Sequence, residues 1–273
     1  MILYILALIW LIIAIMQDLK RKEIDNWLNF SLIIIALAFR AFVSVQEKNP
    51  NFLFQGLIGF AIFFAIANLF YYSRIFAGGD AKLLMALGPI LPLSAGITSN
   101  LITLFYFILL LLFAGAVYNL AYTLIIISKN KTKFSLKFKL RLKKDKSIVL
   151  IPLISLLILT AILLLIKAYS LIILAVLLLI LPLLYIYTKT IESMMIIKTN
   201  PENLREGDWL AEEIKIKCKT IKPKWEGLSK QEIGLIRKSN LQIKIKNGIP
   251  FSPAFLMAFI LLILLRYSSW SLF

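Results

Sequence analysis

The chain has 273 residues, of which 60% are hydrophobic, and its 31 lysines and arginines against 14 acidic residues give a formal net charge of +17. A soluble domain is about 45–50% apolar, so this composition indicates a membrane protein with several spans. Histidine is absent and Cys218 is the one cysteine, which excludes histidine-based zinc sites, Ser-His or Cys-His catalysis and an internal disulfide.

Eight apolar segments follow one another along the chain, and most are long enough to cross a bilayer as helices. The fourth is shorter and contains Gly88, Pro89 and Pro92, which indicates a short or partly re-entrant helix. The first has no basic region before it and no cleavage site after it, so we expect it to be retained. The segments cover residues 2–17, 27–45, 52–73, 81–95, 100–127, 148–167, 169–188 and 249–267.

The basic residues lie mainly in four connections between these segments, and the other connections carry little charge. The four are residues 20–22, the stretch 74–82, the stretch 129–146 and the long polar region 188–247. Cytoplasmic loops are enriched in Lys and Arg, so the pattern predicts an outside N-terminus with all four on the cytoplasmic side. The positive charge then faces anionic lipid, and since no nucleic-acid motif occurs, we expect a lipid bilayer and no nucleic acid as partner.

The predicted fold class is an all-α polytopic membrane protein with about eight transmembrane helices and a small cytoplasmic α/β module before the last. In that module, Ser229 followed by Glu232 predicts a helix start, and the alternation over residues 241–246 predicts a strand. The expected divisions are a catalytic membrane domain at 1–128, a basic cytoplasmic loop at 129–147, two further helices at 148–188, the module at 189–248 and a last helix at 249–273.

Two aspartates fall at the cytoplasmic ends of predicted spans. Asp18 ends the first segment, and Asp80 follows Gly78 and Gly79 at the start of the fourth. An ionisable residue at membrane depth is a candidate functional residue, and two neighbouring carboxylates that share a proton provide a general acid and a general base without any metal or cofactor. Simpler interpretations remain open: Asp18 as a solvated loop residue, Asp80 as a helix cap, and Lys82 as a membrane anchor instead of an accessory catalytic residue.

Three sequence blocks resemble the type IV prepilin peptidase family of GxGD aspartic proteases, and most closely its archaeal preflagellin and prepilin peptidases. The first block is QDLKRKEIDNWL at residues 17–28, and the second is GGDAKLLMALG at residues 78–88. The third combines LREGDWL at 204–210 with GIPFSPAF at 248–255. Two positions depart from the family pattern: Ala77 replaces its first glycine, and Asp25 replaces the usual proline of the first block.

The resemblance implies that Asp18 and Asp80 are the catalytic pair at the cytoplasmic face, with Gly78 and Gly79 supporting the motif backbone and Lys82 as a possible accessory residue. It implies no metal and no cofactor. The implied activity is endopeptidase cleavage of class III signal peptides, which are the short basic leaders of pilin-like and archaellin precursors. The paired cysteines of many bacterial members are missing, so we expect a protease without N-methyltransferase activity.

Rival functions make different predictions. A presenilin-like intramembrane aspartic protease would cut inside a substrate helix. A proton- or cation-coupled transporter would hold its carboxylates near mid-membrane on discontinuous helices, whereas both aspartates here are expected at one edge. A non-enzymatic assembly subunit would tolerate the loss of both carboxylates.

Overall fold

The computed structural model describes residues 2–94, 96–168, 171, 178, 180–216, 219–239 and 242–267. It contains two compact units. Unit 1 consists of Met1–Tyr122 and Ile249–Phe273, and unit 2 consists of Thr123–Gly248. Unit 1 therefore joins the two ends of the chain and includes both candidate aspartates.

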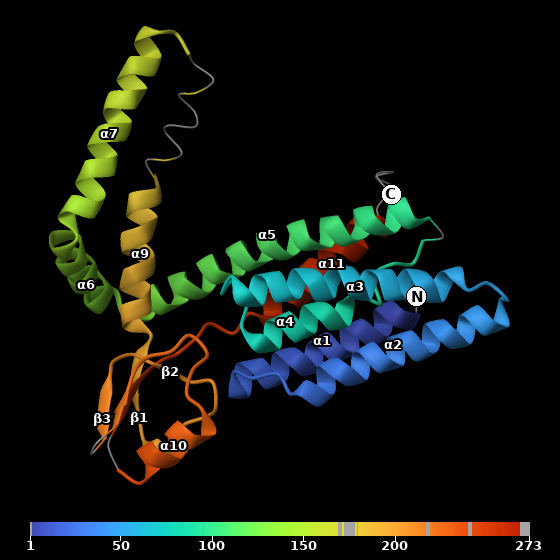
Figure 1. The fold of residues 1–273 in the computed structure, drawn as a ribbon. Helices are drawn as coiled ribbons and strands as arrows, with labels where there is room; N and C mark the ends of the chain where they lie inside the picture. Colours follow the sequence, from blue (N-terminus) through green and yellow to red (C-terminus); the bar gives the residue numbers. More distant parts are fainter. Residues whose placement is uncertain are drawn as a thin grey trace. The chain divides into compact units, whose positions relative to one another are not determined.

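Unit 1 is a bundle of apolar helices (Figure 1). Helix α2 packs against α1, α3 and α4, while α3 also packs on α4 and α11 packs on α1. Helix α5 begins in this unit and continues past its boundary. The helices are α1 (Ile2–Arg21), α2 (Asn26–Gln46), α3 (Asn51–Tyr72), α4 (Gly78–Leu87), α5 (Ile97–Lys129) and α11 (Ser252–Tyr267).

Five helices among the described residues are long and apolar enough to cross a membrane: α1, α2, α3, α5 and α7 (Lys146–Leu165). Exposed side chains such as Ile12, Ile34 and Phe64 are apolar, as lipid-facing side chains must be. These features indicate a mostly helical membrane protein with five candidate spans among the described residues. They do not confirm eight, because α11 is shorter than a typical span and nine of the twenty residues of the predicted segment 169–188 lie outside the described residues.

Helix α4 is too short to cross a bilayer by itself. Its ten residues extend about 15 Å, roughly half of a typical hydrocarbon core. Its leucines Leu83, Leu84 and Leu87 are buried inside unit 1. Pro89 cannot continue a regular helix, so the segment predicted at 81–95 consists of a short helix and a turn-rich stretch within the bundle.

The close approach of α3 and α4 depends on two glycines. A Cβ added to Gly59 would collide with the carbonyl oxygen of Gly88. A Cβ added to Gly88 would lie 2.7 Å from the oxygen of Gly59 and 2.8 Å from Cα of Phe60. These neighbours are backbone atoms that cannot rotate away, so the contact requires glycine both at position 59 of α3 and at position 88, which directly follows α4.

We therefore expect Gly88→Ala to destabilise the protein by about 1–3 kcal/mol, the usual cost of forcing extra volume into a packed contact. Gly96→Ala is the matched control, because an added Cβ at Gly96 has nothing within 4 Å. Thermal unfolding in detergent micelles measures the difference. Equal melting temperatures for the two variants would contradict the proposed backbone contact.

Arg40 is fully buried near the end of α2 and holds the stretch that follows α4. Its guanidinium donates to the backbone carbonyls of Pro89, Ile90 and Pro92, and to that of Phe52 at 2.7 Å. The same group lies 4.3 Å from the centre of the Phe52 ring. Arg40 thus provides hydrogen bonds for three carbonyl groups of the stretch after α4 and for one carbonyl in the first turn of α3.

Among the described residues of unit 2, the helices α6 (Lys131–Lys144), α7 and α9 (Ile180–Met194) precede the strands. Helices α6, α7 and α9 pack against one another. The structure corrects the prediction of a loop at 129–147. Phe and Leu occupy every second position from 134 to 142, with Lys and Arg at most positions between them, and the segment nonetheless forms a basic helix with no buried residue.

The rest of unit 2 is a small α/β module with its own apolar core. An antiparallel sheet has the strand order β1-β5-β2, and a separate hairpin pairs β3 with β4. The elements are β1 (Ile196–Thr199), a 3-10 turn (Pro201–Asn203), β2 (Trp209–Leu210), β3 (Ile214–Ile216), β4 (Lys219–Ile221), α10 (Lys230–Arg237) and β5 (Ile243–Lys246). The core residues are Leu204, Leu210, Ile221, Leu228, Ile233, Ile236, Ile243 and Ile245.

Two local predictions in this module are confirmed. Ser229 caps α10 and accepts a hydrogen bond from the backbone of Glu232, whose side chain bonds back to the Ser229 backbone. In β5, Ile243 and Ile245 are buried while the alternating lysines are not, so the predicted period of two is observed. The single cysteine, Cys218, lies outside the described residues.

Candidate active site

Asp18 lies in the last turn of α1 and is 7% exposed. One of its carboxylate oxygens, Oδ2, accepts a hydrogen bond from the backbone N–H of Ser252 at 3.0 Å. Its carbonyl oxygen accepts the N–H of Lys22, a residue with a left-handed φ of 58° that ends the helix. The side chain therefore points into the protein and not into the basic loop, which does not fit the interpretation of Asp18 as a solvated loop residue.

The loop after α1 folds back toward the start of α4. The Asp25 backbone N–H donates to Oε1 of Gln17 at 3.0 Å, which closes the loop. Ile24 is buried, and a Cβ built on Gly79 would lie 3.6 Å from the Ile24 backbone nitrogen. Lys82 Nζ donates to Oδ1 of Asn26 at 2.7 Å. These contacts join the first sequence block to the second at one end of the bundle.

Asp80 is half-buried in the first turn of α4. Ala77 is the N-cap of this helix, so Asp80 is its third residue, the position from which a carboxylate commonly bonds the backbone of the cap. A hydrogen bond between the Asp80 side chain and the Ala77 backbone fits that arrangement. The capping interpretation is therefore compatible with a catalytic one, since a carboxylate has a second oxygen.

The two carboxylates interact electrostatically. Asp80 lies outside the five membrane-length helices. Burial, followed by the negative charge of Asp18, raises the pKa of the Asp80 carboxyl to about 7, while the hydrogen bond with Ala77 acts in the opposite direction. Two carboxyl groups that repel one another's ionisation hold a single shared proton over a range of pH. This is the charge state in which one group accepts a proton and the other donates one.

The backbone of the Ala-Gly-Gly-Asp turn is unstrained. Ala77 has φ −71° and ψ 162°, which any residue adopts, so alanine in place of glycine is accommodated. Gly78 and Gly79 have no positive φ, and a Cβ at either position would make only ordinary contacts. Their role as backbone support of the motif, and that of Lys82 as an accessory residue, remain predictions.

An aromatic cluster attaches this turn to α11. The buried ring of Phe76 lies 5.4 Å from the ring of Phe251 and 5.9 Å from that of Phe255. On the other side Phe76 contacts Phe70 of α3 at a centroid distance of 5.0 Å. Packed rings of this kind fix the direction in which the chain enters α4.

Three residues that interact with the candidate site, or with the stretch that follows α4, were not identified from the sequence: Ser252, Tyr118 and Arg40. Tyr118 of α5 lies within electrostatic range of Asp18. Ser252 lies inside the third resemblance block, so a signal was present, but its sequence separation from Asp18 concealed the contact. Within the described residues, no group of three or more His, Cys, Asp or Glu side chains could hold a metal ion.

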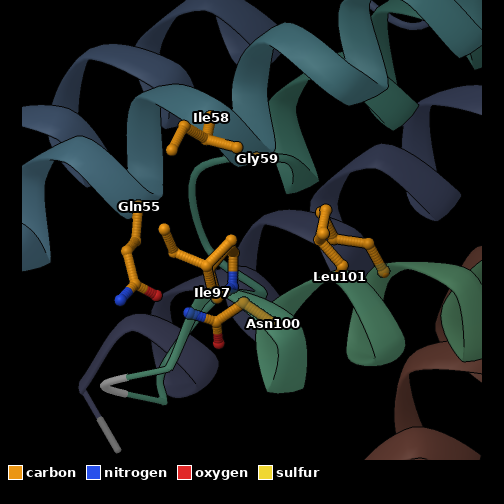
Figure 2. Close-up of a pocket in the computed structure, with 8 residues that line it drawn as sticks. Gln55, Ile58, Gly59, Ile97, Asn100 and Leu101 are labelled. Carbon is orange, nitrogen blue, oxygen red and sulfur yellow. The ribbon is translucent and has the colours of Figure 1, made fainter.

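A small cavity lies at the opposite end of the bundle and does not belong to this site. Figure 2 shows Gln55 and Ile58 from the first turns of α3 beside Ile97, Asn100 and Leu101 from the start of α5. Its volume of about 10 Å³ is enough for one water molecule. The residues that line it include no ionisable side chain, so it has none of the groups that acid–base chemistry needs.

Comparison with known proteins gives the same family as the sequence blocks. Residues 5–126 match the model of the type IV leader peptidase family. Over these residues, which are less than half of the chain, the sequence is similar to the type IV leader peptidases. The matched region contains both aspartates and ends long before α11.

Similar curated proteins are preflagellin peptidases from three methanogens. The identity over 92 residues is 32% for Methanocaldococcus jannaschii, 34% for Methanococcus voltae and 33% for Methanococcus maripaludis. Each match covers 34% of this chain and 39–40% of the relative. The chain thus spans about two fifths of the length of these preflagellin peptidases. No solved structure has significant similarity to it.

Proposed function

We propose that this protein is a membrane aspartic endopeptidase that removes short basic leaders from pilin-like or archaellin precursors. The observation that carries the proposal is the junction of the two sequence blocks, where Ile24 meets Gly79 and Lys82 meets Asn26. This junction brings Asp18 and Asp80 within electrostatic range of one another. The match to the leader peptidase family and to proteins named preflagellin peptidases supports the same activity.

The chemistry needs only the two carboxyl groups and water. The ionised carboxylate removes a proton from water, whose oxygen attacks the peptide carbonyl carbon. The protonated carboxyl donates to the carbonyl oxygen as the tetrahedral intermediate forms. When the intermediate collapses, the C–N bond breaks. The carboxyl group that took the proton from water gives it to the amine nitrogen that leaves. The carboxylate that donated to the carbonyl oxygen takes a proton from a hydroxyl group of the intermediate. The original charge state is thus restored.

We propose that both aspartates face the cytoplasm, with the N-terminus of the chain outside. Helices α1 and α3 each lead from the opposite end of the bundle to the end that holds the site. That end carries Lys20, Arg21, Arg74 and Lys82, in agreement with the enrichment of cytoplasmic loops in basic residues. A leader peptide that stays in the cytoplasm would meet the site where the apolar helix of its precursor enters the membrane.

The proposal is tested with the purified full chain and a precursor that has a short basic leader followed by an apolar helix. We expect release of the leader in detergent micelles or liposomes, measured as a smaller product by gel electrophoresis and mass spectrometry. The absence of any product, from a protein whose circular dichroism and melting curve show that it is folded, would overturn the assignment.

A further inference from the structure

The N-terminus of α11 touches the candidate catalytic pair. Ser252 is the first residue of this helix, and its backbone N–H donates to Oδ2 of Asp18 at 3.0 Å. Ser252 is 0% exposed and Asp18 is 7% exposed, so water does not compete strongly for this contact. The two residues are 234 positions apart, and Ser252 lies outside the region that matches the leader peptidase family.

The hydrogen-bonding groups of this first turn favour a negative charge at Asp18. The first N–H groups of a helix have no partner within it and carry a partial positive charge. The second residue of α11, Pro253, has no N–H, and the N–H of Ala254 is bonded to the carbonyl of Phe251. The Ser252 N–H is directed at the carboxylate, and a hydrogen bond to a charged acceptor is about twice as strong as a neutral one.

The hydroxyl group of Ser252 is a second polar group at the same place. Its oxygen is completely buried and has no hydrogen-bond partner within the described part of the chain. Buried hydroxyl groups normally have a partner, which a water or substrate atom would supply at a working site. The start of α11 is therefore more polar than the packing of an apolar helix requires.

The packing of α11 fixes the position of Ser252. The ring of Phe251 lies against Gly115 of α5, where a Cβ would be 2.6 Å from its Cζ. Phe251 and Phe255 pack on Phe76, which directly precedes the turn that holds Asp80. The helix start is thus attached to the segments that bear both aspartates.

Asp18 interacts electrostatically with ionisable groups of other elements. These include Asp80 of α4 and Tyr118 of α5. The nearest cations along the chain, Lys20 and Arg21, are exposed to solvent, which screens them. The first turn of α11 contains no charged side chain, so its effect on Asp18 comes from the backbone.

We propose that Ser252 is a positioning residue whose backbone N–H holds Asp18 as the charged member of the pair, which leaves Asp80 as the protonated member. This inference rests on the proposed function and assigns the two chemical roles. Asp18 is then the base that removes the proton from water, and Asp80 is the acid that donates to the peptide carbonyl oxygen. The elevated pKa of Asp80 is in agreement with that division.

Ser252→Pro tests the role of the N–H. Proline removes the N–H and is well tolerated at the first position of a helix. If Asp18 is the charged member, the variant destabilises the active monoanion relative to the doubly protonated pair. The acid limb of the cleavage–pH profile then moves up by about one to two pH units, the amount expected for a hydrogen bond to a charged group. The basic limb of the profile does not move, because Asp18 is charged both in the active monoanion below that limb and in the dianion above it.

Ser252→Ala is the matched control, since it keeps the N–H and removes only the hydroxyl. We expect its acid limb to coincide with that of the wild type. Three outcomes would overturn the inference: an unmoved acid limb in Ser252→Pro, a shift of its basic limb alone, or an equal shift in Ser252→Ala. The second outcome would mean that Asp80 carries the charge.

A second measurement needs no variant and therefore does not depend on the folding of Ser252→Pro. Dicyclohexylcarbodiimide reacts with protonated carboxyl groups in apolar surroundings, and peptide mass spectrometry locates the product. Near neutral pH we expect modification of Asp80 and not of Asp18, whereas preferential modification of Asp18 would overturn the inference. The wild-type cleavage assay separates this failure from that of the proposed function, because a wild type that does not cleave contradicts the proposed function itself.

Discussion

Replacement of Asp80 by asparagine is expected to abolish leader cleavage while the protein stays folded. Asparagine has nearly the same shape but cannot donate or accept the proton that the reaction requires. General acid–base catalysis typically contributes about 10²–10⁴-fold, so we expect a loss of at least about 100-fold in kcat/KM. Because the substitution also removes one of two repelling carboxyl groups, the melting temperature should equal or exceed that of the wild type. Asp18→Asn is expected to have a similar effect on cleavage.

Asp25→Asn is the matched control for these variants. Asp25 belongs to the same loop block, but its carboxylate is partly exposed and lies 3.7 Å from the Arg21 guanidinium. Such surface ion pairs contribute about 0–1 kcal/mol, so this variant should cleave at close to the wild-type rate. Retention of activity in Asp80→Asn, or a comparable loss in Asp25→Asn, would refute the assignment of the catalytic pair.

Arg40→Met is expected to produce the largest loss of stability. Methionine fills part of the volume but donates no hydrogen bond, so the carbonyls of Phe52, Pro89, Ile90 and Pro92 lose a shared partner. Each buried polar group without a partner costs about 1–3 kcal/mol, which gives an expected total of about 3 kcal/mol or more. Thermal unfolding in micelles measures the change, and cleavage should fall because Arg40 fixes the far end of α4.

Two comparisons separate this effect from a loss of charge. Arg74→Met removes an exposed arginine and should lower the melting temperature far less. Arg40→Lys retains the charge, but a single ammonium cannot reproduce the forked donors of a guanidinium, so we expect an intermediate loss. A melting temperature for Arg40→Met equal to that for Arg74→Met would contradict the structural role of Arg40.

The sequence was sufficient to predict the features that depend on local patterns. Long apolar runs predicted most of the helices, and Gly88 with Pro89 predicted that the fourth segment would be interrupted. The capping box at Ser229 and the alternation in β5 were also recognisable, because each depends on neighbours within a few residues. The alternation of basic and neutral connections predicted that Asp18 and Asp80 lie at the same end of the bundle.

Features that depend on distant partners could not be predicted. The role of Ser252 requires knowledge that α11 packs on α1, and no pattern near Ser252 indicates it. Gly59 and Gly88 each resemble an ordinary glycine until the two helices are placed together. Arg40 was part of an apolar segment, and its carbonyl partners become evident only when the turn after α4 is known.

The prediction of a loop at 129–147 failed for a different reason. The density of lysine there was interpreted as a solvated connection, whereas Phe134, Leu136, Phe138 and Leu140 recur between the lysines. These apolar residues recur at every second position, which is the period of a strand, yet the segment forms the helix α6. Neither the charge nor the apolar period of this segment therefore predicted its local structure.

The most direct test of the central claim is the position of the bond that the purified protein cuts in a precursor with a short basic leader. Mass spectrometry of both products identifies the new N-terminus. The account predicts one cut, at the junction between the leader and the apolar helix, which is lost in Asp18→Asn and in Asp80→Asn. A cut inside the apolar helix, or the same cut in either variant, would contradict it.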